Sequence, residues 1–356
     1  MDYYFRHLAP CTLHLVPGFF IFLNIQKKQS LQKILIIRFS SIGDIVLTTP
    51  IIRCLKQQLP DAEIHFLTKE KFYPVIKANP DIDQLHVFQD DLASVIRTLK
   101  KLDFNFVVDL HRNLRSARVK MALRKPSGTF NKLNFKKWLM VNFKINKLPD
   151  RHIVDRYFEA VKKLGVVNDM KGLDYFIPEE DILNPGNLPL SHQEGFIAWV
   201  IGGMHYTKML PGEKIIELCS MIKKPIVILG DQGDYDMAER IKDHCQDKVY
   251  NACGNYNINQ SASILSRASV VLTNDTGLMH IAAALRKEIY SFWGNTIPGF
   301  GMYPYLPAGE GKSHILEVEG LSCRPCSKIG YKKCPKKHFR CMMDHDLEQL
   351  AAKLNA

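Results

Sequence analysis

The sequence TNDTGLMHIAAALRKEIYSFWGNT, residues 273–296, contains the turn and helix start that best indicate how this chain folds. A short apolar run, residues 268–272, precedes it and is typical of a buried parallel strand. Residues 274–277 then read Asn-Asp-Thr-Gly, and such residues commonly cap a helix. Apolar side chains follow at helical spacing, at Leu278, Ile281, Ala282 and Leu285. The stretch therefore predicts a strand–turn–helix unit of an α/β domain.

The start of this helix is a candidate anion-binding site. The first backbone N–H groups of a helix have no partner within it, and the positive end of the helix dipole lies there. His280 follows Thr276 by four residues and shares its helical face, so its ring can reach the same anion. The alternative is an ordinary capped helix with a hydrogen-bonded histidine. The choice depends on whether the rest of the chain offers a partner site.

Length and composition indicate a soluble protein of two domains. The chain has 356 residues, and a single domain has roughly 150. Hydrophobic residues make up 46% and charged residues 24%, as in ordinary globular proteins.

The basic charge is concentrated in one part of the chain. The net charge is +12, and residues 97–151 alone contain 15 Lys and Arg against three acidic residues. Such a segment is either a solvated surface or the contact for a polyanion: nucleic acid, an anionic membrane or a phosphorylated substrate. No zinc-finger or RNP-like pattern accompanies it, so nucleic acid is not favoured.

Residues 1–30 fit neither predicted domain, and we interpret them as an N-terminal extension. Residues 13–25 are mostly apolar but too short and too interrupted to span a bilayer. They also lack the features of a signal peptide. Nine cysteines without an export signal indicate the reducing cytoplasm.

The first half of the chain alternates predicted strands with predicted helices. The first strand, residues 33–38, leads into Phe-Ser-Ser-Ile-Gly-Asp and an apolar helix from Ile45 to Leu55. Further strands are predicted at 63–67, 84–88 and 104–109, with helices at 71–78, 92–102 and 152–164. Such alternation is typical of a parallel sheet with right-handed crossovers.

Polar side chains follow two of these strands. Asp44 comes after the first strand, at the sheet edge where open α/β sheets bind ligands. Alternatively it caps the helix, which is worth about 1 kcal/mol. His111, Arg112 and Arg115 follow strand 104–109 at the same edge. Arginine suits phosphate or carboxylate groups, although both arginines also fit a plain charged surface.

Two segments interrupt the alternation. From residue 125 to residue 150 the strand–helix pattern is lost in a basic segment dotted with aromatic residues, and we expect a mobile flap that faces a membrane or an acceptor. Residues 178–195 are rich in proline and glycine, as in an interdomain linker. We therefore predict an N-terminal domain over 31–180, a linker over 181–195 and a C-terminal domain over 196–356.

The second half repeats the strand–helix rhythm. Strands are predicted at 196–201, 225–229 and 248–253, and helices at 213–222, 235–244, 260–267 and 346–354. Lys208 follows the first of these strands beside a glycine pair, where its ammonium group could bind a diphosphate. A lone lysine is otherwise simply solvated.

Three segments together resemble glycosyltransferase family 9, the lipopolysaccharide heptosyltransferases. They are IIRFSSIGD at 36–44, TKMLP at 207–211 and NDTGLMHIAAA at 274–284. The resemblance covers roughly residues 33–345. It implies an α/β GT-B fold, in which two Rossmann-like, doubly wound domains face each other across a cleft. It also implies an inverting, metal-independent glycosyltransferase that moves a sugar, heptose from ADP-heptose, onto a lipid-A-linked core acceptor.

The resemblance also implies roles for particular residues. Asp44 matches the general base. The donor-binding positions are Thr207, Lys208, Asp275, Thr276, Gly277 and His280, with Asp234 where the family often has an acid near the ribose. The match at Asp234 departs in residue type. The acceptor side would comprise Ser41, Gly43, His111, Arg112 and Arg115.

These roles fit together chemically. One base takes the proton of the acceptor hydroxyl, and fixed donors stabilise the departing diphosphate. No cofactor is expected beyond the nucleotide-diphosphate sugar as co-substrate. The expected partners are an anionic lipid-linked oligosaccharide and the cytoplasmic surface of the inner membrane, to which a monomer would bind peripherally. Nucleic acid is not expected.

Four cysteines near the end form a C-x₂-C-x₇-C-x₆-C pattern. They are Cys323, Cys326, Cys334 and Cys341. The pattern could hold a structural zinc ion, although its second pair lacks the usual close spacing. The alternative is four reduced structural thiols.

Two other functions compete with the transferase. A sugar-nucleotide epimerase on the same fold would not need the basic acceptor segment. A catalytically silent protein that binds anionic glycolipids would not need both Asp44 and the 275–280 motif. A dehydrogenase does not fit, because no G-x-G-x-x-G follows any predicted strand.

Overall fold

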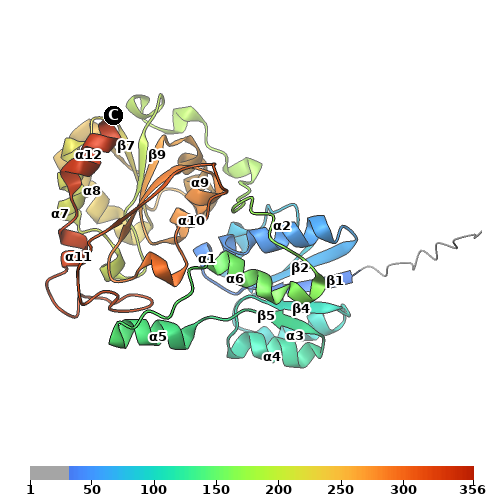
Figure 1. Ribbon diagram of the computed structural model, residues 1–356. Helices are drawn as coiled ribbons and strands as arrows, with labels where there is room; N and C mark the ends of the chain where they lie inside the picture. Colours follow the sequence, from blue (N-terminus) through green and yellow to red (C-terminus); the bar gives the residue numbers. More distant parts are fainter. Residues whose placement is uncertain (1–31) are drawn as a thin grey trace, which may run out of the picture. The chain divides into compact units, whose positions relative to one another are not determined.

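A computed structural model describes residues 32–356, which belong to one compact unit. The predicted extension, residues 1–30, lies outside the described residues. Two parallel sheets organise the described chain (Figure 1). We refer to residues 32–164, which contain the first sheet, as the first lobe. Residues 197–355, which contain the second sheet, are the second lobe.

The first sheet has five parallel strands in the order β3-β2-β1-β4-β5. The strands are β1 (Gln32–Ile37), β2 (Ala62–Lys69), β3 (Gln84–Phe88), β4 (Phe106–Asp109) and β5 (Ser127–Thr129). Its α-helices are α1 (Ile42–Val46), α2 (Thr49–Gln58), α3 (Leu92–Lys100), α4 (Leu114–Leu123), α5 (Asn134–Phe143) and α6 (Ile153–Tyr157). In the central strand, Ile34 and Ile36 pack into one apolar cluster and Leu35 and Ile37 into another. Both faces of the sheet are therefore covered, as in a doubly wound fold.

The second sheet has six parallel strands in the order β11-β10-β9-β6-β7-β8. The strands are β6 (Ile197–Val200), β7 (Ile226–Leu229), β8 (Val249–Asn251), β9 (Val270–Asn274), β10 (Glu288–Trp293) and β11 (Ser313–Glu317). Its α-helices are α7 (Gly212–Met221), α8 (Tyr235–Cys245), α9 (Ile258–Arg267), α10 (Gly277–Ala284), α11 (Arg340–Met343) and α12 (Leu347–Asn355). Strand β11 escaped the sequence analysis because only two of its five residues are strongly apolar.

The single helix predicted after Asp44 is wrong, because the chain forms two helices there. Pro50 lies in the first turn of α2, where its missing N–H costs nothing, and it cannot continue α1. The hydroxyl groups of Thr48 and Thr49 donate to the carbonyls of Ile45 and Val46, at 2.7 and 2.8 Å. These bonds satisfy carbonyl groups that a continuous helix would have used.

Two other predicted helices are mostly replaced by tighter turns. The segment predicted as helix 71–78 is the 3₁₀ helix Glu70–Val75, which contains Pro74. Of the predicted helix 152–164, only α6 is α-helical, and two short 3₁₀ helices, Phe158–Ala160 and Lys162–Leu164, complete it.

The expected loss of the strand–helix pattern at 125–150 is also wrong, since the segment contains β5 and α5. Strand β5 pairs with β4 through the register Val107↔Ser127. Gly128 also lets β5 lie against the 3₁₀ helix Phe158–Ala160, because a Cβ there would collide with the carbonyl group of Ala160. The predicted domain limits remain a prediction, but the strands of the two sheets do fall on either side of residues 181–195.

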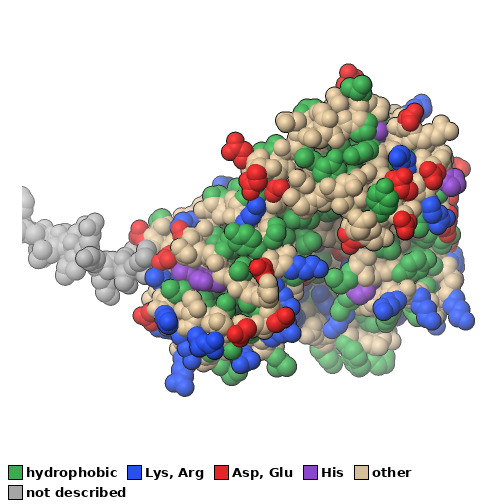
Figure 2. Space-filling model, turned by 180° about the vertical axis from the view of Figure 1, so that it is seen from behind, with side chains coloured by type: hydrophobic (Ala, Val, Ile, Leu, Met, Phe, Trp, Pro, Cys, Tyr) green, Lys and Arg blue, Asp and Glu red, His purple; other side chains and the backbone are tan. Residues whose placement is uncertain are grey.

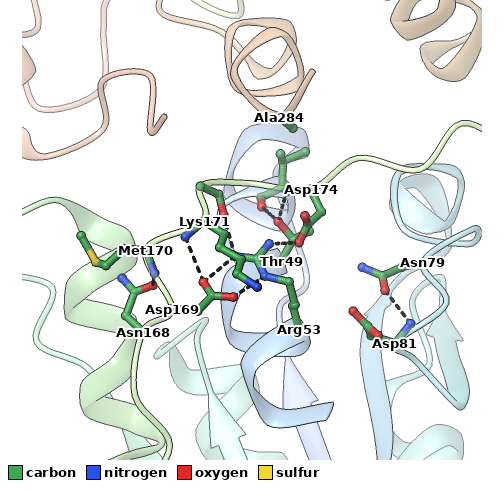
Figure 3. A network of polar contacts seen from close by, with 12 residues as sticks. Thr49, Arg53, Asn79, Asp81, Asn168, Asp169, Met170, Lys171, Asp174 and Ala284 are labelled. Atoms are coloured by element: carbon green, nitrogen blue, oxygen red, sulfur yellow. Dashed lines mark hydrogen bonds and ion pairs between the residues drawn. The ribbon is translucent and has the colours of Figure 1, made fainter. Parts of the chain in front are cut away.

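An ionic network fixes the segment that leaves the first lobe (Figure 3). Arg53 on α2 donates to both carboxylate oxygens of Asp169, each at 2.8 Å, and also binds Asp174 and the carbonyl of Gly172. The amide of Asp174 donates to the hydroxyl of Thr49 at 2.9 Å. Burial would lower the pKa of Arg53, but these carboxylates raise it, so the guanidinium stays charged.

Candidate active site

The carboxylate of Asp44 lies at the end of β1, in the first turn of α1. Its Oδ1 pairs with Nη2 of Arg38 at 2.6 Å. Its Oδ2 accepts from the amide and the hydroxyl of Ser41, at 3.2 and 2.9 Å. The side chain is 23% exposed, so one side of the carboxylate remains accessible. Of the predicted acceptor residues, Ser41 thus orients the proposed base directly.

Asp44 is held in its ionised form. Burial alone would raise the pKa of this carboxyl, but the charge of Arg38 and the hydrogen bonds from Ser41 outweigh burial and lower it. The carboxylate is therefore ready to accept a proton at neutral pH.

Arg38 itself is fixed by the protein around it, a role that the sequence did not reveal. It is 7% exposed and donates to the carbonyl of Leu110 at 2.5 Å and to the hydroxyl of Tyr157 at 3.1 Å. Its Nε donates to the carbonyl of Ser40 at 2.7 Å. The available signal was a cation that directly follows an apolar strand and precedes an acidic turn.

The turn after β4 brings His111 but not Arg115 to the neighbourhood of Asp44. The ring of His111 packs on Phe39 with centroids 4.8 Å apart. Its pKa is lowered to about 4 by burial and by the charges of Arg38 and Lys132, so the ring is neutral. Arg115 instead lines a cavity of about 360 Å³, together with residues 88–93, Leu114 and Arg118.

Lysines of the basic segment also approach Asp44. Burial and the charge of Arg38 lower the pKa of Lys132. Burial and the charge of Arg156 lower the pKa of Lys137 to about 8, whereas Asp44 raises it. Arg112 belongs to the same group, although its Nη1 donates to the carbonyl of Phe130 at 2.9 Å. Sequence spacing missed both lysines, because they follow no predicted strand.

In the second lobe, Lys208 and Asp275 form an ion pair of 2.5 Å. The hydroxyl of Thr296 donates to the same Asp275 oxygen at 3.1 Å. The side chain of Lys208 is 18% exposed, so its ammonium group can be reached from solvent. The structure therefore joins two of the segments that define the predicted donor site.

Two other predicted donor residues are held more firmly. The buried Thr207 hydroxyl accepts from the amide of Tyr331 at 2.8 Å, which leaves little capacity for a ligand. Asp234 accepts from the amide of Asp231 at 2.9 Å. A Cβ at Gly202 or Gly230 would collide with the Asp234 carboxylate, so these glycines allow it to lie at the ends of β6 and β7.

The start of α10 has the form that the sequence predicts. Thr276 is its N-cap residue with extended backbone, and its side chain makes no capping bond to the helix. Gly277 is the first helical residue, and both residues are half-buried. The turn therefore presents a helix start to which a phosphate group can bind.

The two lobes contact each other at Gly43 in α1 and Gly277 at the start of α10. A Cβ on Gly277 would lie 2.8 Å from Cβ of Ile42 and 3.3 Å from the amide nitrogen of Gly43. A Cβ on Gly43 would lie 2.5 Å from Cδ2 of His280, which is on α10 like Gly277. Because real side chains do not come this close, glycine is required on both sides of the contact.

His280 lies beside Gly43, where the charges of both Asp44 and Asp275 act on its ring. It is 2% exposed, and its Cδ2 blocks the space beside Gly43. Burial lowers its pKa to about 4, although Asp275 and Asp44 both raise it. A neutral imidazole therefore links the surroundings of Asp44 to those of the Lys208–Asp275 pair.

Asn295 is a candidate ligand contact that the sequence analysis did not identify. Its side chain is 1% exposed, and within residues 32–356 neither amide atom has a hydrogen-bond partner. Its backbone amide donates to the carbonyl of Thr207 at 3.3 Å, which places it beside the donor residues. Buried amides without partners are rare and costly, so Asn295 is a candidate partner for a ligand group.

The four cysteines near the end do not form a metal site in the described part of the chain. Among residues 32–356, no group of three or more His, Cys, Asp and Glu side chains is placed to hold a metal ion. Cys326 donates to the carbonyl of Cys323 at 3.1 Å, and Cys341 is buried in the second lobe. The zinc hypothesis is therefore not supported, and all four are free thiols.

Comparison with known proteins agrees with this arrangement. A family model described as glycosyltransferase family 9 (heptosyltransferase) matches residues 92–336. The chain is 26% identical over 290 residues to lipopolysaccharide heptosyltransferase 1 of Campylobacter coli, covering 74% of this chain and 84% of that protein.

Two solved structures share the two-lobed fold. ADP-heptose lipopolysaccharide heptosyltransferase II of Escherichia coli is 18% identical, with a TM-score of 0.69 over 91% of this chain and 98% of that one. An E. coli heptosyltransferase solved with ADP-2-deoxy-2-fluoro heptose is also 18% identical, with a TM-score of 0.65 over 91% and 100%. The fold is the GT-B fold. Because the family match covers more than half of the sequence, the chain belongs to glycosyltransferase family 9 and is a glycosyltransferase that uses a nucleotide sugar.

Proposed function

We propose that this enzyme transfers a heptosyl group from ADP-heptose to a lipid-A-linked core acceptor, with inversion at the anomeric carbon and without a metal ion. The observation that carries the proposal is the contact between the two motifs. The charges of Asp44, Asp275 and Lys208 all act on the neutral ring of His280, whose Cδ2 lies beside Gly43. A base and a phosphate-binding cation are thereby held near one buried ring.

In the proposed reaction, the acceptor hydroxyl attacks C1 of the donor sugar. The hydroxyl proton passes to Asp44, and the bond between C1 and the diphosphate oxygen breaks. A single base on the face opposite the leaving group gives inversion. The ionised state of Asp44 and its fixed orientation by Arg38 and Ser41 support this role.

The departing diphosphate carries the charge that develops. Lys208, the start of α10 and the ring of His280 are the proposed donors that stabilise it, together with Thr276 and Gly277. We also propose that Asp234 lies near the ribose and that Asn295 contacts the donor. Thr207 would act through its backbone, since its hydroxyl binds Tyr331.

The proposed acceptor side is the cationic neighbourhood of Asp44. The charge of Asp44 acts on Lys132, Lys137 and His111, and the charge of Arg112 acts on Lys132. Ser41 binds the carboxylate, and Gly43 precedes it in the chain. Figure 2 shows Lys and Arg side chains around a hollow of the molecular surface. Such a site suits an acceptor sugar that carries phosphate or carboxylate groups. Arg115 would contact a more distant part of the acceptor.

The acceptor lipid implies a place of action. We propose that the enzyme is a monomer that binds peripherally to the cytoplasmic surface of the inner membrane. No helix among residues 32–356 is long and apolar enough to span a bilayer.

The test is a panel of nucleotide sugars, first for thermal stabilisation of the protein and then for transfer to lipid-A-linked core. ADP-heptose should raise the melting temperature most, because stabilisation follows the ratio of ligand concentration to dissociation constant. Mass spectrometry should show one added heptose, NMR should show inversion, and a chelator should leave the rate unchanged. If another nucleotide sugar stabilised the protein most, that sugar would replace ADP-heptose as the proposed donor. If a chelator abolished activity, the proposal of a metal-independent reaction would be wrong.

A further inference from the structure

We propose that α5 and residues 327–337 together form the surface with which this enzyme binds an anionic lipid bilayer. We call this surface the basic-aromatic face. The inference rests on the proposed function in that the bilayer holds the acceptor lipid. It goes further because it assigns the contact to particular side chains, and it can be tested without any transfer.

Helix α5 is unusual in that none of its ten residues is buried. Phe135, Trp138 and Phe143 are 69%, 49% and 58% exposed. The Phe135 and Trp138 rings stack with centroids 6.0 Å apart, and Phe143 meets Trp138 edge-on at 5.2 Å. Three large rings packed on one another in water form a contiguous apolar patch rather than scattered exposed residues.

The segment 327–337 of the second lobe adds matching side chains. Ile329 and Tyr331 are 55% and 43% exposed. Five exposed lysines surround them, namely Lys328, Lys332, Lys333, Lys336 and Lys337. The wider segment 320–343 contains seven Lys and Arg and no acidic residue, and residues 130–149 contain five lysines and no acidic residue. These two segments thus contain as many cations as the chain has net positive charges, +12.

Direct contacts join the two segments. Nζ of Lys144, next to the end of α5, donates to the carbonyls of Cys323 and Pro325 at 3.2 and 2.7 Å. Nζ of Lys137 lies 5.3 Å from the centre of the Phe300 ring, also in the second lobe. Figure 1 places α5 at the lower edge of the molecule, between α4 and the segment that leads to α11. Figure 2 shows Lys and Arg side chains gathered along the lower edge, near hydrophobic ones.

The chemistry of the face favours a bilayer over other partners. Aromatic rings partition into the headgroup region, and each lysine near an anionic surface adds attraction. Lysine stems can lie along apolar surface while the ammonium groups stay in water. A nucleic-acid site would be expected to contain arginine for bidentate contacts with phosphate, but the exposed cations of 327–337 and α5 are all lysines.

The position of the face also explains how a lipid-linked acceptor reaches the base. The inner side of α5 directs Lys137 toward Arg156 and the neighbourhood of Asp44, whereas its outer side carries the rings. A bilayer bound to the rings would therefore hold headgroups close to the cationic neighbourhood of Asp44.

The test is co-sedimentation of the full chain with vesicles, without donor or acceptor. Vesicles of phosphatidylcholine with phosphatidylglycerol should bind, those of phosphatidylcholine alone should not, and added salt should weaken binding. Trp138 is the one exposed tryptophan of three, since Trp199 and Trp293 are buried. Its fluorescence should therefore shift to the blue and be quenched by brominated lipid when the rings enter the headgroup region.

Two matched pairs of variants decide whether this face is responsible. Phe135→Ser/Trp138→Ser/Phe143→Ser should weaken binding at least tenfold, whereas Val167→Ser/Leu190→Ser, at exposed apolar positions elsewhere, should not. Lys336→Glu/Lys337→Glu should weaken binding, whereas Lys223→Glu/Lys224→Glu in the second lobe should change it far less. Thermal unfolding confirms that each variant folds.

Several outcomes would overturn the proposal. The triple serine variant could bind vesicles as tightly as the wild type, or the control variants could lose as much vesicle binding as the test variants. The triple variant could also convert a dimer into a monomer, or the protein could bind an oligonucleotide in place of vesicles. If vesicles bind through this face but no sugar is transferred, the proposed function fails and the docking surface stands. If sugar is transferred but vesicles do not bind, the docking surface fails and the proposed function stands.

Discussion

Each lobe contains one acid–cation pair next to the contact between lobes, and the two pairs differ in how firmly they are held. Asp44 and Arg38 are 2.6 Å apart, and Asp275 and Lys208 are 2.5 Å apart. The Arg38 guanidinium makes three further hydrogen bonds to its surroundings. Lys208 makes no other side-chain hydrogen bond among residues 32–356, and it is more exposed than Arg38, at 18% against 8% of the side chain.

This difference corresponds to two different tasks. A planar guanidinium with several fixed partners keeps its carboxylate in one orientation, as a base requires. An ammonium group on a flexible stem can exchange Asp275 for a phosphate oxygen at little cost. We infer that the first pair is permanent and that the second is a resting state of a phosphate-binding cation.

Removing the acid of the permanent pair should have the largest effect. Asp44→Asn keeps the size of the side chain but removes the base, so kcat should fall by about 10²- to 10⁴-fold. The dissociation constant of the nucleotide sugar, measured by calorimetry, should change little. If kcat survives in Asp44→Asn, the base must be sought elsewhere.

Removing the cation of the exchangeable pair should have the next largest effect, and on donor binding. Lys208→Ala loses one charge-assisted hydrogen bond to the diphosphate, which should weaken donor binding by about 10- to 100-fold. Lys214→Ala is the matched control, because Lys214 pairs with Glu217 on α7 and its side chain, at 19%, is about as exposed as that of Lys208. Equal donor affinity in Lys208→Ala would show that the Asp275 pair is permanent too.

A smaller effect should follow from making the permanent pair flexible. Arg38→Lys keeps the charge but loses the fork geometry, so kcat should fall by about tenfold while KM stays similar. The acid limb of the pH–rate profile should move to higher pH, because Asp44 loses part of the interaction that lowers its pKa. A purely structural role of Arg38 would lower protein stability without moving that limb.

The smallest expected effect concerns pH and the acceptor. The pKa of Lys137 is about 8, so its charge is present below that pH and is lost above it. The KM for an anionic acceptor should therefore rise between pH 7 and pH 9, by a factor of about five if one ion pair is lost. Lys137→Arg should remove this rise, since arginine stays charged. A rise that persists in the arginine variant would assign it to another group.

The comparison also separates what periodicity predicts from what it misses. Strand ends predicted Asp44, Lys208 and the 274–280 turn, because in parallel sheets polar residues gather at one edge. Arg38, Lys137 and Asn295 escaped because their importance comes from neighbours distant in sequence. Thr207 shows the opposite limit. Its position predicts a donor-binding residue, but its hydroxyl accepts a hydrogen bond from the amide of Tyr331.

The same limit applies to the basic segment. Its charge predicts an anionic partner, and its lack of alternation suggests a mobile flap. The chain nevertheless forms α5 there, with Lys137 and Lys144 contacting groups more than 150 residues away in sequence. Helix α5 has no buried face, so no periodic signal exists for a sequence pattern to detect.

The sequence by itself determined the alternating α/β architecture, the two halves and the family motifs, because periodicity and turn chemistry are local properties. Only the tertiary structure decided that Gly43 meets Gly277, that Leu110 and Tyr157 fix Arg38, and that Lys144 next to α5 binds the carbonyls of Cys323 and Pro325. These contacts join residues far apart in the chain. Their energies depend on burial and on distances of a few ångströms, which the order of residues does not encode locally.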